Sequence, residues 1–449
     1  MPPPFLVQLE REESKGVVFI LCWLVRDTKR KKLRSGIMGC LLSTPGDSGG
    51  ACRMRNPGSI GEVAVFVPGF RIPKGVDFAQ SLGDSVPKSL AERIAALRAR
   101  VVVMVAQETP LSAKPRRRTA TRHGGSTLAN LLRALEDYLP VLLGLVKDGS
   151  RLRDKVRFAW ANQEDDAEET VMANAWYEVL SVLHLMSMLC LSQANSMLLP
   201  RAAGDSYHQP RVSGESKRTS VDVFLKAAGY LDCAIQHVLP QIPPQSSRRD
   251  LPVDLTEGVL RALSLQALGQ GVDIQLGMAI DSPKATLAVK RRLACEMAKL
   301  RITSRSFLSR RLGEKHQLFV RWKLVEAKAA AYYFHGLILD EGNTEKSHGM
   351  AAAALQASEE FLKESKKACA AFNSVPPTSR NPPLWGCMKY LTEKIPKDAS
   401  SKVRVNRDLY TQERIIETAP TLPDFALALK PDDYQLPQLD PIWNNGISF

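Results

Sequence analysis

The residues best suited to chemistry form a short motif at residues 38–43 (MGCLLS). The motif fits the N-myristoylation pattern Met-Gly-x-x-x-Ser/Thr, and Cys40 beside Gly39 is a candidate for palmitoylation. One myristoyl chain binds membranes only marginally, at about 10⁴ M⁻¹, so a second acyl chain is needed for stable anchoring. Myristoyl transfer needs a free N-terminal glycine, however, and 37 residues precede Met38. From the residues alone, a lipidation site and a chance hexapeptide in a loop both stay open.

Elsewhere the sequence offers no group of residues at catalytic or metal-ligand spacing. None of the seven His lies in an HExxH motif or has Cys or carboxylate neighbours at metal-ligand spacing. Neither a GxxxxGK(S/T) loop nor a GxSxG elbow occurs. Gly269 and Gly271 lie within a helical pattern rather than after a strand, which indicates helix packing rather than a dinucleotide site. We therefore predict no catalytic residue, no metal, no cofactor and no small-molecule substrate.

Two further groups of polar residues have structural explanations. The acidic run 164–169 (EDDAEE) precedes an apolar helical pattern, and the helix dipole favours negative charge at that end. His184 and His335 lie inside apolar helical patterns, which indicates histidines of a core or an interface.

The positive charge of the chain is unevenly placed. The formal net charge is +14, yet residues 1–37 carry eight basic and four acidic residues, and residues 300–312 carry four arginines and no acid. The positive charge that remains on the rest of the chain is modest, and it suits an acidic membrane surface as well as a nucleic acid. We expect no nucleic-acid partner.

Cysteine usage and hydropathy point to a cytosolic protein. The eight Cys contain no CxxC pair, and no Asn-x-Ser/Thr sequon occurs, which favours a reducing compartment. The apolar run Gly16–Val25 is ten residues long, whereas a membrane-spanning helix needs roughly 20. The longer run 179–191 contains His184 and two Ser and is typical of a core helix.

The elements that must position any site are mostly helices. Apolar residues recur at helical spacing, and short polar joints separate the segments. The tail from Pro420 is Pro-rich, and we expect it to lie extended on the surface. Residues 60–66 alternate as in a short strand. The pattern predicts an α-solenoid or elongated bundle. The predicted helices span residues 128–146, 166–199, 215–239, 255–280, 283–299, 314–340, 344–373 and 384–394.

Four segments resemble, in collinear order, motifs of the Bro-type (Alix-like) domain family. Residues 223–233 resemble its ALxxAAGxFxxL helix, and residues 263–281 its LSxLMLAQAQExFxxKAxxD segment. Residues 326–355 resemble its Ala/Tyr-rich helix and the KxGExIAxL helix that follows, and residues 405–431 its DNDxIYxxxVP…LPxI…KP ending. The resemblance covers roughly residues 60–435 and is strongest to the plant endosomal-targeting Bro-like proteins, whose chains typically begin Met-Gly-Cys.

The resemblance implies an all-α fold, an elongated, banana-shaped helical domain with a helical-repeat (TPR-like) core and a short β element near its N-terminus. It implies that Met38 is the working start and that Gly39 and Cys40 carry lipid. Residues 1–37 would be an atypical extension, 38–59 a flexible lipidation tether, 60–435 the Bro-type domain and 436–449 a Pro-rich tail. Residues 300–312 depart from the family, which continues the preceding helix with a Trp/Gln-rich stretch.

The function that the resemblance implies is that of a non-catalytic scaffold in the cytoplasm, peripheral on endosomal membranes and acting in multivesicular-body sorting. Such a domain binds the C-terminal amphipathic helix of an ESCRT-III subunit in an apolar groove. By motif alignment the groove positions fall near Leu276, Val289 and Leu293. Val289 and Leu293 are four residues apart and share one helix face. The alternative is that all three are ordinary core residues.

Two departures from the family bear on the partner. The groove Phe of the family is replaced around Gln275-Leu276, and a family Lys is replaced by Met278. A second hypothesis therefore stays open, in which the same fold recruits a non-ESCRT partner at a membrane and the ESCRT groove is lost.

Overall fold

The computed structural model describes residues 66–108, 124–147, 151–163, 169–198, 212–243, 250–307, 313–342, 344–376, 388–409 and 418–444. Gly39, Cys40 and the predicted tether lie outside the described residues, as do residues 60–65 of the expected first strand.

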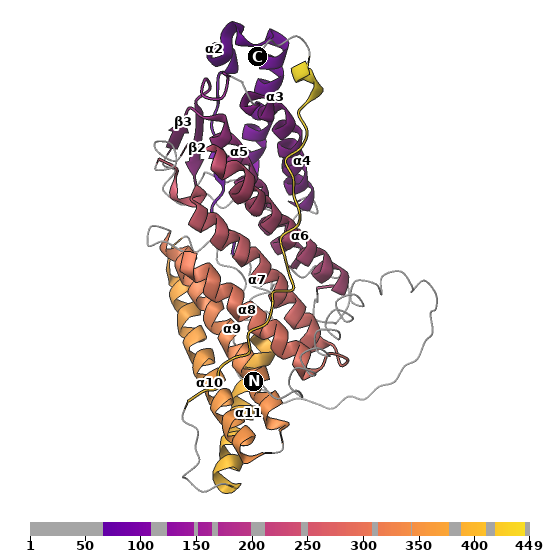
Figure 1. Cartoon of the computed structure of the whole chain (residues 1–449), viewed down its shortest axis with the longest axis vertical. Coiled ribbons are helices and arrows are strands. Elements are labelled where there is room, and N and C mark those ends of the chain that lie inside the picture. Colours follow the sequence, from indigo (N-terminus) through magenta and orange to yellow (C-terminus); the bar gives the residue numbers. More distant parts are fainter. Residues whose placement is uncertain are drawn as a thin grey trace, which may run out of the picture.

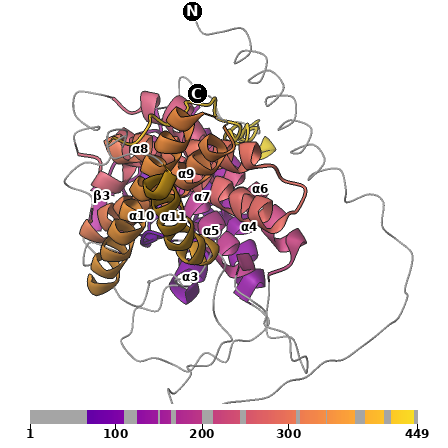
Figure 2. The same ribbon diagram turned by 90° about the horizontal axis from the view of Figure 1, so that it is seen from below.

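Helices dominate the described chain, and each long helix packs on the next one in sequence from α3 to α11. This order gives an elongated molecule, with α2–α4 and the strands at one end and α9–α11 at the other (Figure 1). Seen from below, the helices superpose into one compact cross-section (Figure 2). The predicted all-α, elongated architecture is confirmed. The helices are α2 (Phe78–Leu82), α3 (Lys88–Glu108), α4 (Gly124–Leu142), α5 (Ala175–Leu198), α6 (Gly214–Cys233), α7 (Glu257–Asp281), α8 (Leu287–Phe307), α9 (Glu314–Asp340), α10 (Glu345–Ser374) and α11 (Met388–Leu409).

The predicted β element is a small antiparallel sheet in the order β1-β2-β3. Its strands are β1 (Arg71–Pro73), β2 (Phe158–Asn162) and β3 (Glu169–Met172). The sequence prediction placed a strand at residues 60–66, but Phe66 lies in irregular structure and the strand follows at Arg71. The sheet brings chain segments about 90 residues apart side by side, at the end of the molecule where α3 and α4 lie.

Local side chains explain where several helices begin. Asn174 accepts a hydrogen bond from the Trp176 backbone N–H (2.9 Å), which starts α5 at Ala175. The sequence suggested that the acidic run 164–169 leads into this helix. This prediction is wrong, because the last residue of the run, Glu169, belongs to β3. Thr344 and Ser347 form a reciprocal capping box at the start of α10.

The predicted core helix is the most buried element. An 18-residue window of α5 is apolar enough to cross a bilayer, but 89% of that window is buried inside the protein. This matches a core helix rather than a lipid-facing one. His184 is 1% exposed within it, as the sequence indicated.

Helix α8 runs further than the sequence pattern predicted, to Phe307 instead of about Lys299. Leu300, Arg301 and Ser304 are fully buried. The Ser304 hydroxyl donates to the Ala262 carbonyl (3.1 Å), so the last turns of α8 pack on α7 although they depart from the family pattern.

Residues 418–444, named the strap below, cross the long face of the helical array. The strap is extended up to Asp440 and ends in a short 3₁₀ turn, Pro441–Asn444. Figure 1 shows it, in yellow, passing α8, α7, α6 and α4 toward the far end. The tail is extended, as predicted, but it does not lie wholly on the surface, because Leu429 (9% exposed) and Trp443 (1% exposed) are buried.

Candidate functional site

The candidate partner-helix site lies at the helix pair α7 and α8, where the strap begins its crossing. Leu276 on α7 is 0% exposed, and Val289 and Leu293 on α8 are 8% and 5% exposed. All three belong to the main hydrophobic core, together with Leu429 of the strap. All three predicted positions are therefore buried, Leu276 on α7 and Val289 and Leu293 on α8, which packs on α7. Their role in binding a partner helix stays a prediction.

One polar row of α8 holds the strap. Glu296 is 1% exposed, and its Oε1 accepts the backbone N–H groups of Ala428 (2.6 Å) and Leu429 (3.2 Å). Burial raises the pKa of Glu296, whereas these two hydrogen bonds oppose the rise. One turn on, Lys299 Nζ pairs with Asp424 (2.6 Å). The spacing of Glu296 and Lys299 places both side chains on one face of the helix.

Phe425 of the strap lies near two guanidinium groups. The Arg291 and Arg292 Cζ atoms are 5.7 and 5.5 Å from the centre of its ring. Cation–π pairs of this kind stabilise by about 0.5–2 kcal/mol each, depending on desolvation. Arg292 also donates to the Ala426 carbonyl (3.4 Å). The basic triplet 290–292, which the sequence could place only on a charged helical turn, therefore binds the strap through two of its members.

The two departures from the family lie on α7 beside this region. Gln275 is 9% exposed, and its Oε1 has no hydrogen-bond partner among the described residues. Met278 is half-buried against the core. Half-buried apolar residues also gather where α7 passes into α8; they are Ile280, Ala285 and Leu287.

The far end of the strap is anchored in the core. Trp443 donates its indole N–H to the Val141 carbonyl (2.9 Å), and Gly144 leaves the space that the ring fills. A Cβ at Gly144 would lie only 1.9 Å from the Trp443 ring. Asp440 pairs with Arg93 (2.7 Å) on α3.

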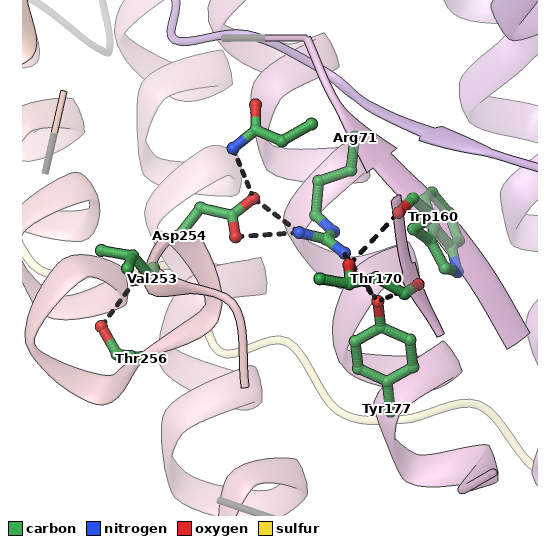
Figure 3. A network of polar contacts seen from close by, with 8 residues as sticks. Arg71, Trp160, Thr170, Tyr177, Val253, Asp254 and Thr256 are labelled. Atoms are coloured by element: carbon green, nitrogen blue, oxygen red, sulfur yellow. Dashed lines mark hydrogen bonds and ion pairs between the residues drawn. The ribbon is translucent and has the colours of Figure 1, made fainter. Parts of the chain in front are cut away.

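A buried polar network lies between the sheet and the helices (Figure 3). Arg71 donates from Nη1 to both carboxylate oxygens of Asp254 (2.8 Å each) and from Nη2 to Thr170 (3.0 Å) and Tyr177 (2.7 Å). Burial raises the pKa of Tyr177. Arg71 is 0% exposed, so the network has the geometry of a clamp that fixes β1 to the helical domain.

A second network is centred on Glu178 of α5, which is 0% exposed. Its carboxylate accepts from Arg98 Nε (2.8 Å), Trp160 Nε1 (2.6 Å) and Tyr138 Oη (3.1 Å). Burial, followed by the Glu178 charge, raises the pKa of Tyr138. Both carboxylate oxygens are engaged, and no side of the group faces solvent. The arrangement supports packing between α3, α4, α5 and β2 rather than proton transfer to a substrate.

Histidines and cysteines of the described chain show no metal-binding arrangement. Burial lowers the pKa of His184, His316 and His335 to about 4, so these imidazoles are neutral at physiological pH. His316 lies 2.7 Å from Gln266. No group of three or more His, Cys, Asp or Glu able to hold a metal occurs in the part of the chain that the structure describes.

The strap contacts are the site feature that sequence reasoning missed. The Leu-Pro motif at 422–423 and the extended tail were visible in the sequence, but not the helix that receives them. A glutamate inside the apolar pattern of α8, Glu296, was the available signal, because a buried carboxylate must find donors.

Comparison with known proteins shows similarity at the level of structure only. No family model matches the sequence, and no curated protein matches it. A Bro1 domain whose structure gives the basis for endosomal targeting matches with a TM-score of 0.53 at 16% identity, over 86% of this chain and 95% of that one. The ALIX BRO1 structure in complex with CHMP4C matches with a TM-score of 0.55 at 17% identity, over 84% and 99%. The chain therefore has the fold of the Bro1 domain.

Proposed function

We propose that this protein is a non-catalytic endosomal scaffold that binds the C-terminal amphipathic helix of an ESCRT-III subunit and acts in multivesicular-body sorting. The observation that carries the proposal is the near-complete coverage of two solved Bro1 domains, one of them in complex with CHMP4C. The Glu178 carboxylate is 0% exposed and binds only neighbouring side chains, so we assign it to packing.

The binding region we propose is the α7–α8 pair around Leu276, Val289 and Leu293. Its apolar character supports helix-in-groove recognition, in which residues at i, i+3 and i+4 of the partner fill apolar positions. The half-buried residues Met278 and Leu287 lie at the rim and offer apolar surface that a partner helix can reach without unfolding the domain.

A pull-down with a C-terminal CHMP4C peptide tests this region. Leu287→Asp places a charge on the half-buried rim, and we expect it to abolish binding while the circular dichroism spectrum of the protein is retained. Val103→Asp is the matched control, since Val103 is 56% exposed on α3, away from α7 and α8. Retention of the peptide by the Leu287→Asp variant would remove the assignment of the site.

Membrane attachment is a separate part of the proposal. We propose that the working chain starts at Met38, that Gly39 is myristoylated and Cys40 palmitoylated, and that this places the protein on the cytoplasmic face of endosomes, as in the plant Bro-like proteins it resembles. Two acyl chains give stable anchoring where one does not. In a membrane flotation assay, Gly39→Ala is expected to release the protein; a variant that still floats would contradict the anchor.

A second candidate function is recruitment of a non-ESCRT partner by the same fold. Two departures from the Bro-type motifs favour it: the groove Phe is replaced around Gln275-Leu276, and a Lys is replaced by Met278. The Gln275 Oε1, which has no hydrogen-bond partner among the described residues, favours it as well. Met278→Lys discriminates the two candidates. If the ESCRT-III site is present but divergent, restoring the family residue should strengthen CHMP4C peptide binding; an unchanged absence of binding favours the second candidate.

A further inference from the structure

The strap is attached to the helical array unequally at its two ends. Trp443 is 1% exposed, whereas Asp424 and Lys299, which form the ion pair at the other end, have side chains 79% and 42% exposed. Exposed ion pairs stabilise little. The Phe425 ring, near Arg291 and Arg292, is only half-buried. The half of the strap on α8 is therefore held by more exposed contacts than the Trp443 end, apart from Leu429 and the two hydrogen bonds that the strap backbone donates to the buried Glu296.

That half lies beside the proposed partner site. Glu296, which binds the strap backbone, follows Val289 by seven residues and Leu293 by three, so the three side chains lie on adjoining parts of one helix face. Leu429 reaches across to α7, where a Cβ at Gly271 would lie 3.0 Å from its Cδ1. Residues 424–429 thus run over the seam between α7 and α8.

The strap is held there as a bound peptide is held. Its backbone N–H groups at Ala428 and Leu429 donate to Glu296, and its Ala426 carbonyl accepts from Arg292. Its apolar side chains at Phe425 and Leu429 pack on the same helices. A segment of this chain therefore occupies the face on which an apolar partner would be received.

We propose that residues 424–429 of the strap are an intramolecular cover of the α7–α8 site, and that strap closure and binding of the partner helix compete. This inference rests on the proposed function and names its regulation. Partner binding lifts residues 418–430, while Trp443 keeps the far half in place, so the cover stays tethered near its site. A site that is open only part of the time binds with an affinity lowered by the open fraction.

The experiment compares two aromatic-to-alanine variants of the full chain. Phe425→Ala removes the ring that contacts Arg291 and Arg292 and changes no residue of α7 or α8. Tyr434→Ala is the control, because Tyr434 packs on Tyr230 of α6 (ring centres 4.6 Å apart), beyond the α8 half of the strap. The probe is a fluorescently labelled C-terminal CHMP4C peptide, titrated by anisotropy.

We expect Phe425→Ala to bind the peptide about tenfold more tightly than the unchanged chain. Loss of the two cation–π contacts should weaken closure of the strap about tenfold, and the open fraction of the site and the apparent affinity should rise by the same factor. Tyr434→Ala should bind within twofold of the unchanged chain. Equal or weaker binding by Phe425→Ala overturns the cover and leaves the proposed function standing. Absence of binding by all three chains overturns the proposed function itself, and the cover with it.

Hydrogen exchange gives an independent readout on the unchanged chain. Saturating peptide should speed exchange of the Ala428 and Leu429 amides, whose acceptor is Glu296, and leave the Trp443 amide protected. Slower exchange at residues 428–429 on peptide binding would show that the strap forms part of the receptor surface, which contradicts competition.

Discussion

Trp443 and Gly144 lie about 300 residues apart in the sequence, yet each requires the other. The Trp443 ring occupies the space above Gly144, where a Cβ would come within 1.9 Å of it, closer than real Cβ atoms approach other groups. Gly144→Ala and Trp443→Ala should therefore produce the same defect by different routes. The first expels the ring and the second removes it.

The expected magnitude follows from burial. Truncating a buried Trp to Ala costs about 3–5 kcal/mol in a core, and the hydrogen bond to the Val141 carbonyl adds about 1 kcal/mol. Because the strap end can detach without unfolding the helices, we expect the lower value, about 3 kcal/mol, for each single variant. The double variant should also cost about 3 kcal/mol, since the anchor can be lost only once.

Urea unfolding followed by far-ultraviolet circular dichroism measures these values, and limited proteolysis reports release of the strap. Gly75→Ala is the matched control, because no atom lies within 4 Å of the added Cβ, and it should be nearly neutral. Additive costs in the double variant, near 6 kcal/mol, would refute the mutual dependence. So would a Gly144→Ala variant as stable as the control.

Three further predictions concern the buried polar groups. Glu178→Gln leaves the Arg98 charge buried without its counter-ion and should cost about 3–5 kcal/mol in urea unfolding, against little change for the exposed Glu92→Gln. Burial lowers the pKa values of His184 and His316 from the ordinary 6.5 to about 4 in the folded state. The unfolded chain therefore binds more protons between these pH values, and the free energy of unfolding falls as pH drops from 6.5 toward 4, by about 2 kcal/mol for each histidine at pH 5. His316→Gln should flatten that pH dependence, and an unchanged slope would contradict a neutral buried imidazole. Burial raises the pKa of Cys190 to about 12, so this thiol should react with a thiol reagent only on unfolding, and rapid native-state labelling would contradict its burial.

Long helices with a clear apolar period were predictable from the sequence. Helix α9 was expected at residues 314–340 and spans Glu314–Asp340, because its apolar face is broad and Gly342 follows its end. Helix α3 was not expected. Apolar residues such as Val103, which is 56% exposed, lie on its solvent face and blur the helical period. A local pattern cannot distinguish such an exposed residue from a core residue.

Non-local contacts explain what the sequence pattern could not supply. Glu169–Met172 is acidic at its start and short, and it becomes a strand only because Phe158–Asn162 lies beside it. Val289 and Leu293 were correctly placed on one helix, but their burial comes from the packing of α8 against other parts of the chain, which the local pattern does not contain. The binding of Ala428 and Leu429 to Glu296 joins residues more than 130 positions apart, which no local period encodes.

We propose that the α7–α8 face of this Bro1-like fold receives an ESCRT-III helix. The most direct test is titration of the full chain with a C-terminal CHMP4C peptide carrying a photoreactive group, followed by mapping of the cross-links. We expect saturable one-to-one binding with cross-links in residues 276–293, and unlabelled peptide should compete it away. Failure of the folded protein to bind saturably, or cross-links confined to other helices, would contradict it.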